Sequence, residues 1–226
     1  GLKLFRNRGA GVFEDVTVSA GLPAKYPFWG TSLSFVDYDR DGHLDLFVVN
    51  AVNYDPTREC HNQADGKQDF CGPKGIPGQV SKLYRNVGGG KFKDVSKESG
   101  VESKEGPGLG VVCADFTGDG WPDLFVANDG RPNHLWVNQR DGTFKEEAVA
   151  RGLAVNAMGG AEGNMGVTWG DVDGDGLQDV FVTHLDFETN TLWRQEPASP
   201  GYFADWTAAS RMNKPQWKAT GVGTIR

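Results

Sequence analysis

The chain has 226 residues, a formal net charge of −7 and no cluster of basic residues, which argues against a nucleic-acid partner because phosphates need a basic face. No apolar run approaches the roughly 20 residues that cross a membrane, so no membrane span is expected. No signal peptide is visible, and because residue 1 falls inside a repeat unit, we expect any targeting segment to have been removed or to lie outside this sequence.

The first predicted element is a β-hairpin that returns along the chain. It reads Leu-Phe-Arg-Asn at 4–7, then Gly-Val-Phe-Glu-Asp-Val-Thr at 11–17, then Gly-Leu at 21–22. Related segments begin at Leu83, at Leu135 and, in a decayed form, at Leu192. An apolar strand, a Gly-containing turn and a second strand are typical of a hairpin.

Between the hairpins lies a second repeated unit, an Asp-rich loop between two apolar segments. Its three copies run from Asp37 to Asp45, from Asp115 to Asp123 and from Asp171 to Asp179. A loop, its two flanking strands and the next hairpin give four short strands, which is the composition of one propeller blade. The sequence therefore predicts an all-β fold, a β-propeller built of four-stranded blades with calcium loops.

The repeats divide the chain, taken as one domain of residues 1–226, into three complete blades and two half-blades. The expected blades cover 31–95, 108–148 and 163–207, with half-blades at 1–20 and 217–226 and an insert at 52–80. The last half-blade rests on Ala219 to Ile225, which resembles the strand before an Asp loop. Two half-blades favour a piece of a larger ring, although joined ends would close a small four-bladed one.

Cysteines bracket the insert within the first blade. Cys60 and Cys71 enclose a polar segment without a strand pattern, where a disulfide would hold a loop that cannot pack by itself. We expect this disulfide, with two unpaired thiols as the alternative. Cys113 lies in an apolar strand and is expected to be a buried thiol.

The spacing Asp-x-Asp-x-Asp-Gly-x-x-Asp predicts calcium sites, because Ca²⁺ prefers six to eight oxygen ligands in a flexible geometry. Loop positions 1, 3, 5 and 9 supply side chains, position 6 is the glycine of the sharp turn, and position 7 supplies a carbonyl. The expected ligands are Asp37, Asp39, Asp41, His43 and Asp45 in the first loop, Asp115, Thr117, Asp119, Trp121 and Asp123 in the second, and Asp171, Asp173, Asp175, Leu177 and Asp179 in the third. Thr117 removes one charge, so the second site is expected to be weaker.

A plain turn, an EF-hand and a zinc site all fit these loops less well than a calcium site. Asp-Gly pairs can simply mark turns, but three copies in one frame between apolar strands favour a metal site. An EF-hand needs an acid at position 12 and flanking helices, whereas position 12 is Val48, Val126 or Val182 and the flanks are β. Hard oxygens without a His or Cys cluster argue against zinc. Three Ca²⁺ ions would bring the formal charge from −7 to −1.

These loops and hairpins resemble the FG-GAP/VCBS repeat family, whose calcium loops also occur in integrin α-subunit propellers. The Leu-Tyr-Arg-Asn motif at 83–86 and Phe-Cys-Gly-Pro at 70–73 are similar to bacterial secreted repeat proteins of the cartilage acidic protein and ASPIC/UnbV group. The resemblance implies a secreted or cell-surface propeller, extracellular or periplasmic, with calcium in its blade loops.

The expected function is a calcium-binding module for adhesion, ligand binding or scaffolding, with a protein or glycan partner at the cell surface or matrix. A structural subunit of a surface layer or fibre, with self-association, is the alternative. A polysaccharide-acting enzyme has only fold-level analogy behind it, since no nucleophile elbow, Cys-His signature or phosphate loop is present, so no enzyme activity is expected. Exposed tryptophans can stack on sugars, but Trp121, Trp136, Trp169 and Trp193 are expected to pack between blades.

Overall fold

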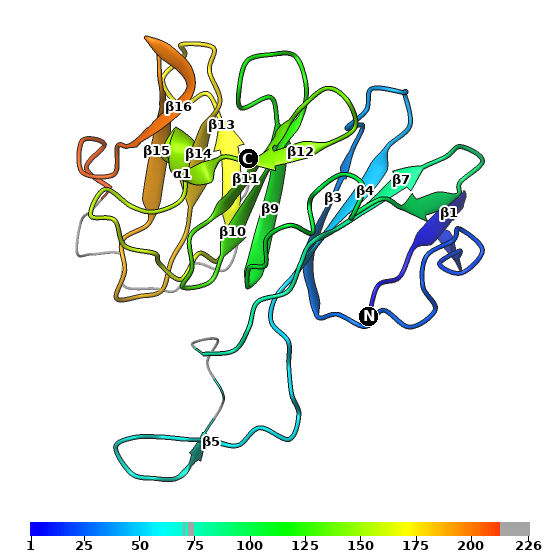
Figure 1. Cartoon of the computed structure of the whole chain (residues 1–226), viewed down its shortest axis with the longest axis horizontal. Helices are drawn as coiled ribbons and strands as arrows, with labels where there is room; N and C mark the ends of the chain where they lie inside the picture. Colours follow the sequence, from blue (N-terminus) through cyan, green and yellow to red (C-terminus); the bar gives the residue numbers. More distant parts are fainter. Residues whose placement is uncertain (70, 72–74, 213–226) are drawn as a thin grey trace.

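The computed structural model describes residues 1–69, 71 and 75–212, and within them the regular secondary structure is almost entirely antiparallel β-sheet (Figure 1). The expected half-blade at 217–226 lies outside the described residues. The short helix α1 (Ala148–Arg151) is the one departure from all-β structure among the described residues. No helix in this part of the chain is long and apolar enough to cross a membrane.

Three four-stranded sheets form the body of the molecule, each with its strands in chain order. The first sheet contains β3 (Gly30–Val36), β4 (Asp45–Asn50), β7 (Lys82–Asn86) and β8 (Phe92–Asp94). The second contains β9 (Gly108–Ala114), β10 (Asp123–Asn128), β11 (His134–Asn138) and β12 (Phe144–Glu146). The third contains β13 (Val167–Gly170), β14 (Asp179–Val182), β15 (Thr191–Glu196) and β16 (Ser199–Asp205). The predicted all-β fold with four-stranded antiparallel sheets is thus confirmed, whereas the number of blades in a closed ring stays a prediction.

Two small hairpins accompany these sheets. At the N-terminal end, β1 (Phe5–Gly9) pairs with β2 (Val12–Asp15). In the insert, β5 (Cys60–His61) pairs with β6 (Gln68–Asp69), so the expectation of an insert without strands was wrong. The insert projects from the end of the first sheet as a separate arm (Figure 1).

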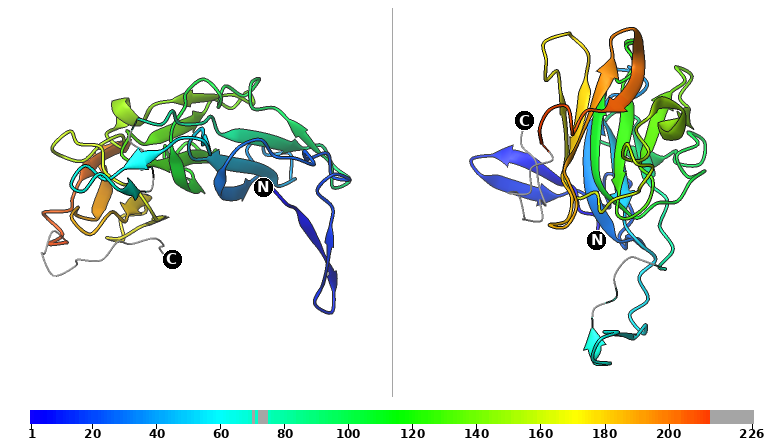
Figure 2. Two further views of the ribbon diagram at one scale, coloured as in Figure 1. Left: turned by 90° about the horizontal axis from the view of Figure 1, so that it is seen from below. Right: turned by 90° about the vertical axis from the view of Figure 1, so that its left-hand side faces the viewer.

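The sheets stand side by side in an open arc (Figure 2). The first strands β3, β9 and β13 lie on its concave side, where β9 contacts both of the others, and the last strands lie on the convex side. The hairpin β1–β2 continues the arc beyond the first sheet.

The second strands of the first two sheets explain why the chain folds this way. All six residues of β4 are buried, and so are all six of β10. Since successive side chains point to opposite faces, Leu46 packs toward the N-terminal hairpin while Phe47 packs toward the second sheet. In the same way Leu124 and Phe125 pack against the first and third sheets. A strand buried on both faces needs a continuous apolar run, which is what these segments contain.

The tryptophans divide between core and surface. Trp136 and Trp193 are each only 1% exposed and belong to the cores between neighbouring sheets, as expected. Trp169 is partly buried against the core between the second and third sheets. Trp121 belongs to no core cluster among the described residues; its ring lies 5.4 Å from the Arg40 guanidinium carbon.

A glycine after the last strand of each unit allows the next sheet to approach. Gly21, Gly100 and Gly152 have φ of +88°, +84° and +82°. A Cβ atom on any of them would contact a backbone oxygen of the neighbouring outer strand, that of Phe92, Phe144 or Phe203. The repeated Gly-Leu or Gly-Val pair therefore marks a close backbone contact between blades, followed by a buried apolar anchor at Leu22, Val101 or Leu153.

Replacing Gly152 with alanine should destabilise the protein more than the same change at an equally strained glycine without a neighbour. In Gly152→Ala the new methyl group adds a clash with Phe203 to the cost of the left-handed conformation, which is about 1 kcal/mol. Gly142 has a φ of +86° and open space around it, so Gly142→Ala has only the conformational cost. Urea unfolding should show a loss larger by at least about 1 kcal/mol for Gly152→Ala, and equal losses in the two variants would contradict the close contact.

Candidate metal centres

The three Asp loops lie at the same end of the molecule, each connecting the first and second strands of its sheet (Figure 1). The glycine at loop position 6 has a φ of +86° at Gly42, +86° at Gly120 and +85° at Gly176. Only glycine adopts this conformation without strain, so the predicted sharp turn is present in all three loops.

The carboxylate at position 9 is the centre of each loop. Asp45, Asp123 and Asp179 begin the second strands and are at most 1% exposed. In the first loop, Asp45 Oδ2 accepts the Tyr38 amide at 3.1 Å and Oδ1 accepts the Asn86 amide at 2.7 Å. Asp123 and Asp179 accept the corresponding amides of their own loops and third strands. One buried side chain thus joins the loop to two strands.

Burial of these carboxylates raises their pKa. The pKa of Asp45 is raised to about 6 by burial and, to a smaller extent, by the negative charges of Asp39 and Asp41, although amide hydrogen bonds oppose the shift. Burial raises the pKa of Asp123 to about 7, with Asp119 and Asp115 adding to it. The pKa of Asp179 is raised for the same reasons. A cation beside each group would offset this cost.

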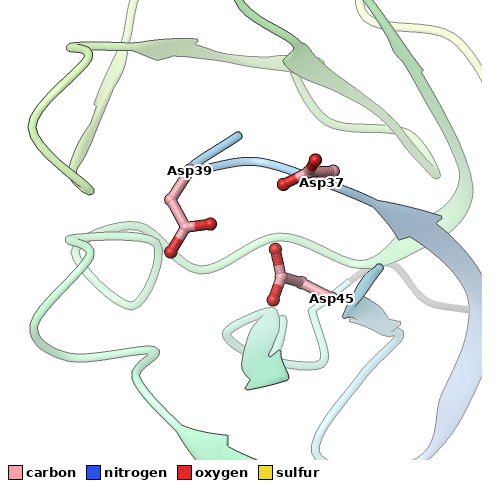
Figure 3. A group of neighbouring side chains, drawn as sticks. All are labelled: Asp37, Asp39 and Asp45. Carbon is pink, nitrogen blue, oxygen red and sulfur yellow. The ribbon is translucent and has the colours of Figure 1, made fainter. Parts of the chain in front are cut away.

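Two of the loops bring three carboxylates together. Asp37, Asp39 and Asp45 each place an oxygen within 4.8 Å of the other two, and their carboxylates converge on one point (Figure 3). Asp171, Asp173 and Asp179 do the same in the third loop. Asp37 Oδ1 is buried and has no hydrogen-bond partner among the described residues, whereas Oδ2 accepts the Gly42 amide at 3.0 Å. An oxygen-only cluster with a free acceptor can hold a hard cation.

The position 5 carboxylates lie outside these groups of three. Asp41 and Asp175 each accept the amide two residues later, from His43 at 2.9 Å and Leu177 at 2.8 Å. Arginines approach the same carboxylates: Arg85 Nη2 lies 3.2 Å from Asp41, and Arg194 Nη2 lies 3.8 Å from Asp175. These arginines also pair with position 3, at Asp39 and Asp173. The alternating Asp residues therefore have different roles, since position 5 also shapes the turn.

The second loop has the same backbone but a smaller acidic cluster. Asp115 accepts the amides of Asp119 and Gly120 at 3.0 and 2.8 Å. Asp119 accepts the Trp121 amide at 2.9 Å and pairs with Arg140. Among the described residues, no group of three carboxylates converges here, because position 3 is Thr117. The Thr117 Oγ1 atom is buried without a hydrogen-bond partner in this part of the chain, so it is an unused oxygen of this loop.

A side-chain amide holds each loop in place, a feature that the Asp spacing alone does not predict. The third strand of each sheet carries this amide two residues after its apolar pair, as Asn86, Asn138 or Gln195. Each donates to the carbonyl at loop position 8, that of Leu44 at 3.0 Å, Pro122 at 3.2 Å or Gln178 at 2.8 Å. Asn138 also donates to the Tyr38 carbonyl of the first loop at 2.8 Å and so links two sheets. The recurrent Asn or Gln at this position was the signal that could have revealed it.

The predicted disulfide is confirmed. Cys60 and Cys71 are bonded, with their Cα atoms 5.2 Å apart, and close the insert. Cys113 is a free thiol that is partly buried, and burial raises its pKa to about 11.

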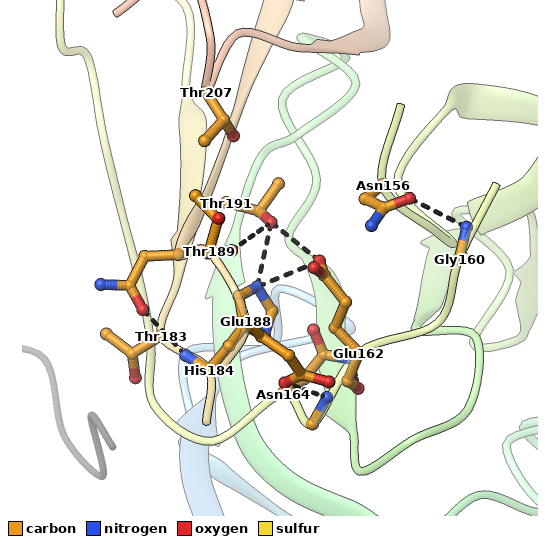
Figure 4. Close-up of polar contacts among 12 residues, drawn as sticks. Asn156, Gly160, Glu162, Asn164, Thr183, His184, Glu188, Thr189, Thr191 and Thr207 are labelled. Atoms are coloured by element: carbon orange, nitrogen blue, oxygen red, sulfur yellow. Dashed lines mark hydrogen bonds and ion pairs between the residues drawn. The ribbon is translucent and has the colours of Figure 1, made fainter. Parts of the chain in front are cut away.

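A second polar cluster lies at the other end of the third sheet (Figure 4). His184 is fully buried; its Nε2 lies 3.0 Å from Thr191 Oγ1 and 3.5 Å from Glu162. Thr191 in turn donates to Glu162 at 3.1 Å. Burial lowers the pKa of His184, so its ring is neutral at physiological pH. Glu162 belongs to the loop at 156–164, so these contacts fix that loop against the sheet. The histidine itself is closed off from solvent and cannot be reached by a substrate.

The linking role of Asn138 predicts a large effect of one amide. Asn138→Ala removes donors to the Tyr38 and Pro122 carbonyls and should lower the free energy of unfolding by about 1–3 kcal/mol. Asn7 occupies the equivalent position in β1 and bonds only its own turn, at the Gly9 amide. Asn7→Ala should therefore cost clearly less in urea unfolding, and a similar loss in both variants would contradict the loop-holding role.

Comparisons with known proteins agree with the repeats. The model of the FG-GAP-like repeat matches residues 1–48, 63–126 and 115–182. Cartilage acidic protein 1 of Mus musculus is 28% identical over 167 residues, covering 74% of this chain and 23% of that protein. The Homo sapiens protein is 28% identical over 187 residues, covering 80% of this chain and 24% of that protein. The chain thus spans about a quarter of the length of these relatives.

A solved structure adds little to these matches. A lectin of Agrocybe aegerita, described as recognising non-reducing terminal N-acetylglucosamine, is 18% identical with a TM-score of 0.32, covering 90% of this chain and 59% of that one. A likeness at this TM-score supports neither a fold nor a ligand. The repeats themselves are decisive, because the family model matches more than half of the residues in the same frames as the Asp loops: the chain belongs to the FG-GAP-like repeat family.

Proposed function

We propose that the chain is a calcium-braced, extracellular ligand-binding module of the β-propeller type, serving adhesion, ligand binding or scaffolding. The observation that carries the proposal is the convergence of three carboxylates around a buried, unpaired oxygen of Asp37 in the first loop. Three carboxylates at this distance repel one another unless a cation lies between them. The disulfide Cys60–Cys71 supports an oxidising, extracellular or periplasmic location.

Calcium is the ion that these donors suit. The side chains offer only oxygen, which a hard cation prefers, and backbone carbonyls and water would complete the six to eight ligands that calcium takes. Asp37, Asp39 and Asp45 would hold one ion, and Asp171, Asp173 and Asp179 a second. Asp115, Thr117, Asp119 and Asp123 would hold a third more weakly, since one charge is missing. Asp41 and Asp175, with the carbonyls of His43, Trp121 and Leu177, stay predicted ligands.

The ions would brace the module and take no part in a reaction. Each ion would neutralise a buried carboxylate that already joins its loop to two strands, so ion binding and sheet stability are coupled. We infer that the module binds a partner and is not an enzyme, because the one histidine cluster described, at His184, is closed off from solvent and the clustered carboxylates of the Asp loops suit an ion. The partner of such a module is a protein or a glycan at the cell surface or matrix.

Calcium should raise the melting temperature, and a position 3 variant should lose part of the gain. Each site held at about 100 times its Kd stabilises the protein by about 2.7 kcal/mol, or roughly 5–10 °C. Asp173→Asn removes one charge from the third site and also weakens the pair that its carboxylate makes with the partly buried Arg194. The variant is therefore compared with itself: its rise in melting temperature between chelator and calcium should be smaller than that of the wild type.

Asp141→Asn is the matched control, because Asp141 shapes a hairpin turn through Thr143 and lies outside the loops. It should keep the full gain in calcium. A wild-type melting temperature that is the same in calcium and in chelator would refute the calcium proposal.

The effect of calcium should also depend on pH. Without metal, Asp45 and Asp123 have pKa values of about 6 and about 7, above the 3.8 of an exposed aspartate. Folding then takes up protons, so these groups lower stability as the pH rises from about 4 to about 7. A cation requires the charged forms and cancels this loss. The calcium-induced rise in melting temperature should be small at pH 5 and larger at pH 8; an equal rise at both would contradict the involvement of these carboxylates.

A further inference from the structure

A pocket of about 500 Å³ lies at the end of the sheets opposite the Asp loops, between the insert and the strands. One wall is formed by Trp29 and Thr31 at the beginning of β3 and by Leu109 at the beginning of β9. Residues of the insert, among them Arg58 and Cys60, also line the pocket, and so does Asp129, directly after β10. The two sheets are joined here by Thr31 Oγ1, which donates to the Gly108 carbonyl at 2.7 Å.

The floor of the pocket is apolar and closely packed. Ala51, Val52 and Ile76 are 6–7% exposed and form a small core of their own. Leu109 and the disulfide-bonded Cys71 pack against it, so the covalent bond of the insert fixes this wall. A concave, largely apolar surface of this size is typical of a ligand site.

Two aromatic rings stand at the rim. Trp29 and Tyr54 are 55% and 58% exposed, although both are large and apolar. Their ring centroids are 5.5 Å apart at an interplanar angle of 76°, so the two exposed rings contact each other edge to face. The Trp29 carbonyl accepts the Ala51 amide at 2.9 Å, which holds this rim to β4. Aromatic faces carry negative charge density that attracts cations.

The charges around the pocket favour a cation. Asp129 is half-buried, and its carboxylate accepts no hydrogen bond from the residues that the structure describes, while its amide is held by the Pro107 carbonyl at 2.9 Å. Burial raises the pKa of Asp129, and the negative charge of nearby Glu188 raises it further. Asp69 adds a second carboxylate, and Arg58 is the one cation among the described lining residues; its Nη1 donates to the Gly75 carbonyl at 3.3 Å. The carboxylate of Asp129 is therefore available to pair with a cationic ligand.

We propose that this pocket binds an organic cation with an apolar body, its ammonium group paired with Asp129 and its body lying between the aliphatic floor and the Trp29–Tyr54 pair. An anion would be repelled by the carboxylate of Asp129, and a neutral sugar would leave the aliphatic floor and the charge of Asp129 unmatched. This ligand class deepens the proposed binding function and rests on it. The ammonium group can come from a free amine or from a lysine side chain of a partner.

The test compares small probes that differ in charge. Phenethylammonium, phenylacetate and methyl β-glucoside are titrated into calcium-loaded, nitrogen-15-labelled protein, and the indole N–H signals of the seven tryptophans are followed by NMR. The signal missing from the half-exposed Trp29→Phe variant identifies Trp29. Phenethylammonium should shift this signal saturably with a Kd of roughly a millimolar, as expected for so small a ligand, and should not shift that of Trp121 at the opposite end.

Variants test whether Asp129 supplies the negative charge that binds the ammonium group. Asp129→Asn keeps the shape of the side chain and should weaken phenethylammonium binding about tenfold, because the charge-assisted pair is lost. Asp141→Asn, far from the pocket, should leave binding unchanged. Nα-acetyl-lysine amide serves as a second cationic probe. A lower Kd than that of phenethylammonium assigns the site to a lysine side chain of a partner, and a higher Kd assigns it to a free amine.

The inference is overturned if phenylacetate or the glucoside binds as well as phenethylammonium, if Asp129→Asn has no effect, or if no probe shifts the Trp29 signal at up to about 50 mM, well above the expected Kd. The melting experiment in calcium and chelator is independent of these probes. A normal calcium response without probe binding therefore rejects the pocket alone, and probe binding without a calcium response rejects only the calcium proposal.

Discussion

Each sheet is organised around a buried carboxylate at the start of its second strand. Asp45, Asp123 and Asp179 are closed off from water and accept amides from their own loop and from the third strand, so one side chain sets the position of three chain segments. Such a group is costly when charged, as the raised pKa values of Asp45 and Asp123 indicate. The Asp loop around it supplies further oxygens, which makes a cation the natural complement of the fold.

The two ends of the sheets are built differently, and in our proposal one end serves stability and the other recognition. At one end, acidic loops are held by Asn86, Asn138, Gln195 and nearby arginines, an arrangement suited to a structural ion. At the other end, the insert closed by Cys60–Cys71 lies over an apolar floor with exposed aromatic rings. The buried strands β4 and β10 run between these two ends.

Much of this was predictable, because it depends on local patterns. The four-stranded sheets follow from apolar runs between glycine turns, and the loop glycines Gly42, Gly120 and Gly176 take the expected conformation. The disulfide followed from two cysteines enclosing a loop without a core. Within the loops, the carboxylates at positions 1, 3 and 9 of the first and third copies come together, whereas position 5, predicted as a ligand in the same way, lies outside these groups; the role of all of them as metal ligands stays a prediction.

Features that depend on distant segments were not predictable. Nothing in the spacing distinguishes Asp41 from Asp39, because the difference arises from the folded turn, in which Asp41 accepts the His43 amide. The pocket combines Trp29, Tyr54 and Asp129, which come together only when the sheets are side by side. The short hairpin in the insert was missed because two-residue strands carry no periodic pattern.

Calcium titration of metal-free protein, followed by calorimetry and native mass spectrometry, tests the central claim most directly. We expect saturation at three ions, two bound tightly by the first and third loops and one more weakly by the loop with Thr117. Exchange of Asp37 for asparagine should remove one tight site and leave the others. Absence of saturable calcium binding, or unchanged binding in that variant, would contradict a calcium-braced fold.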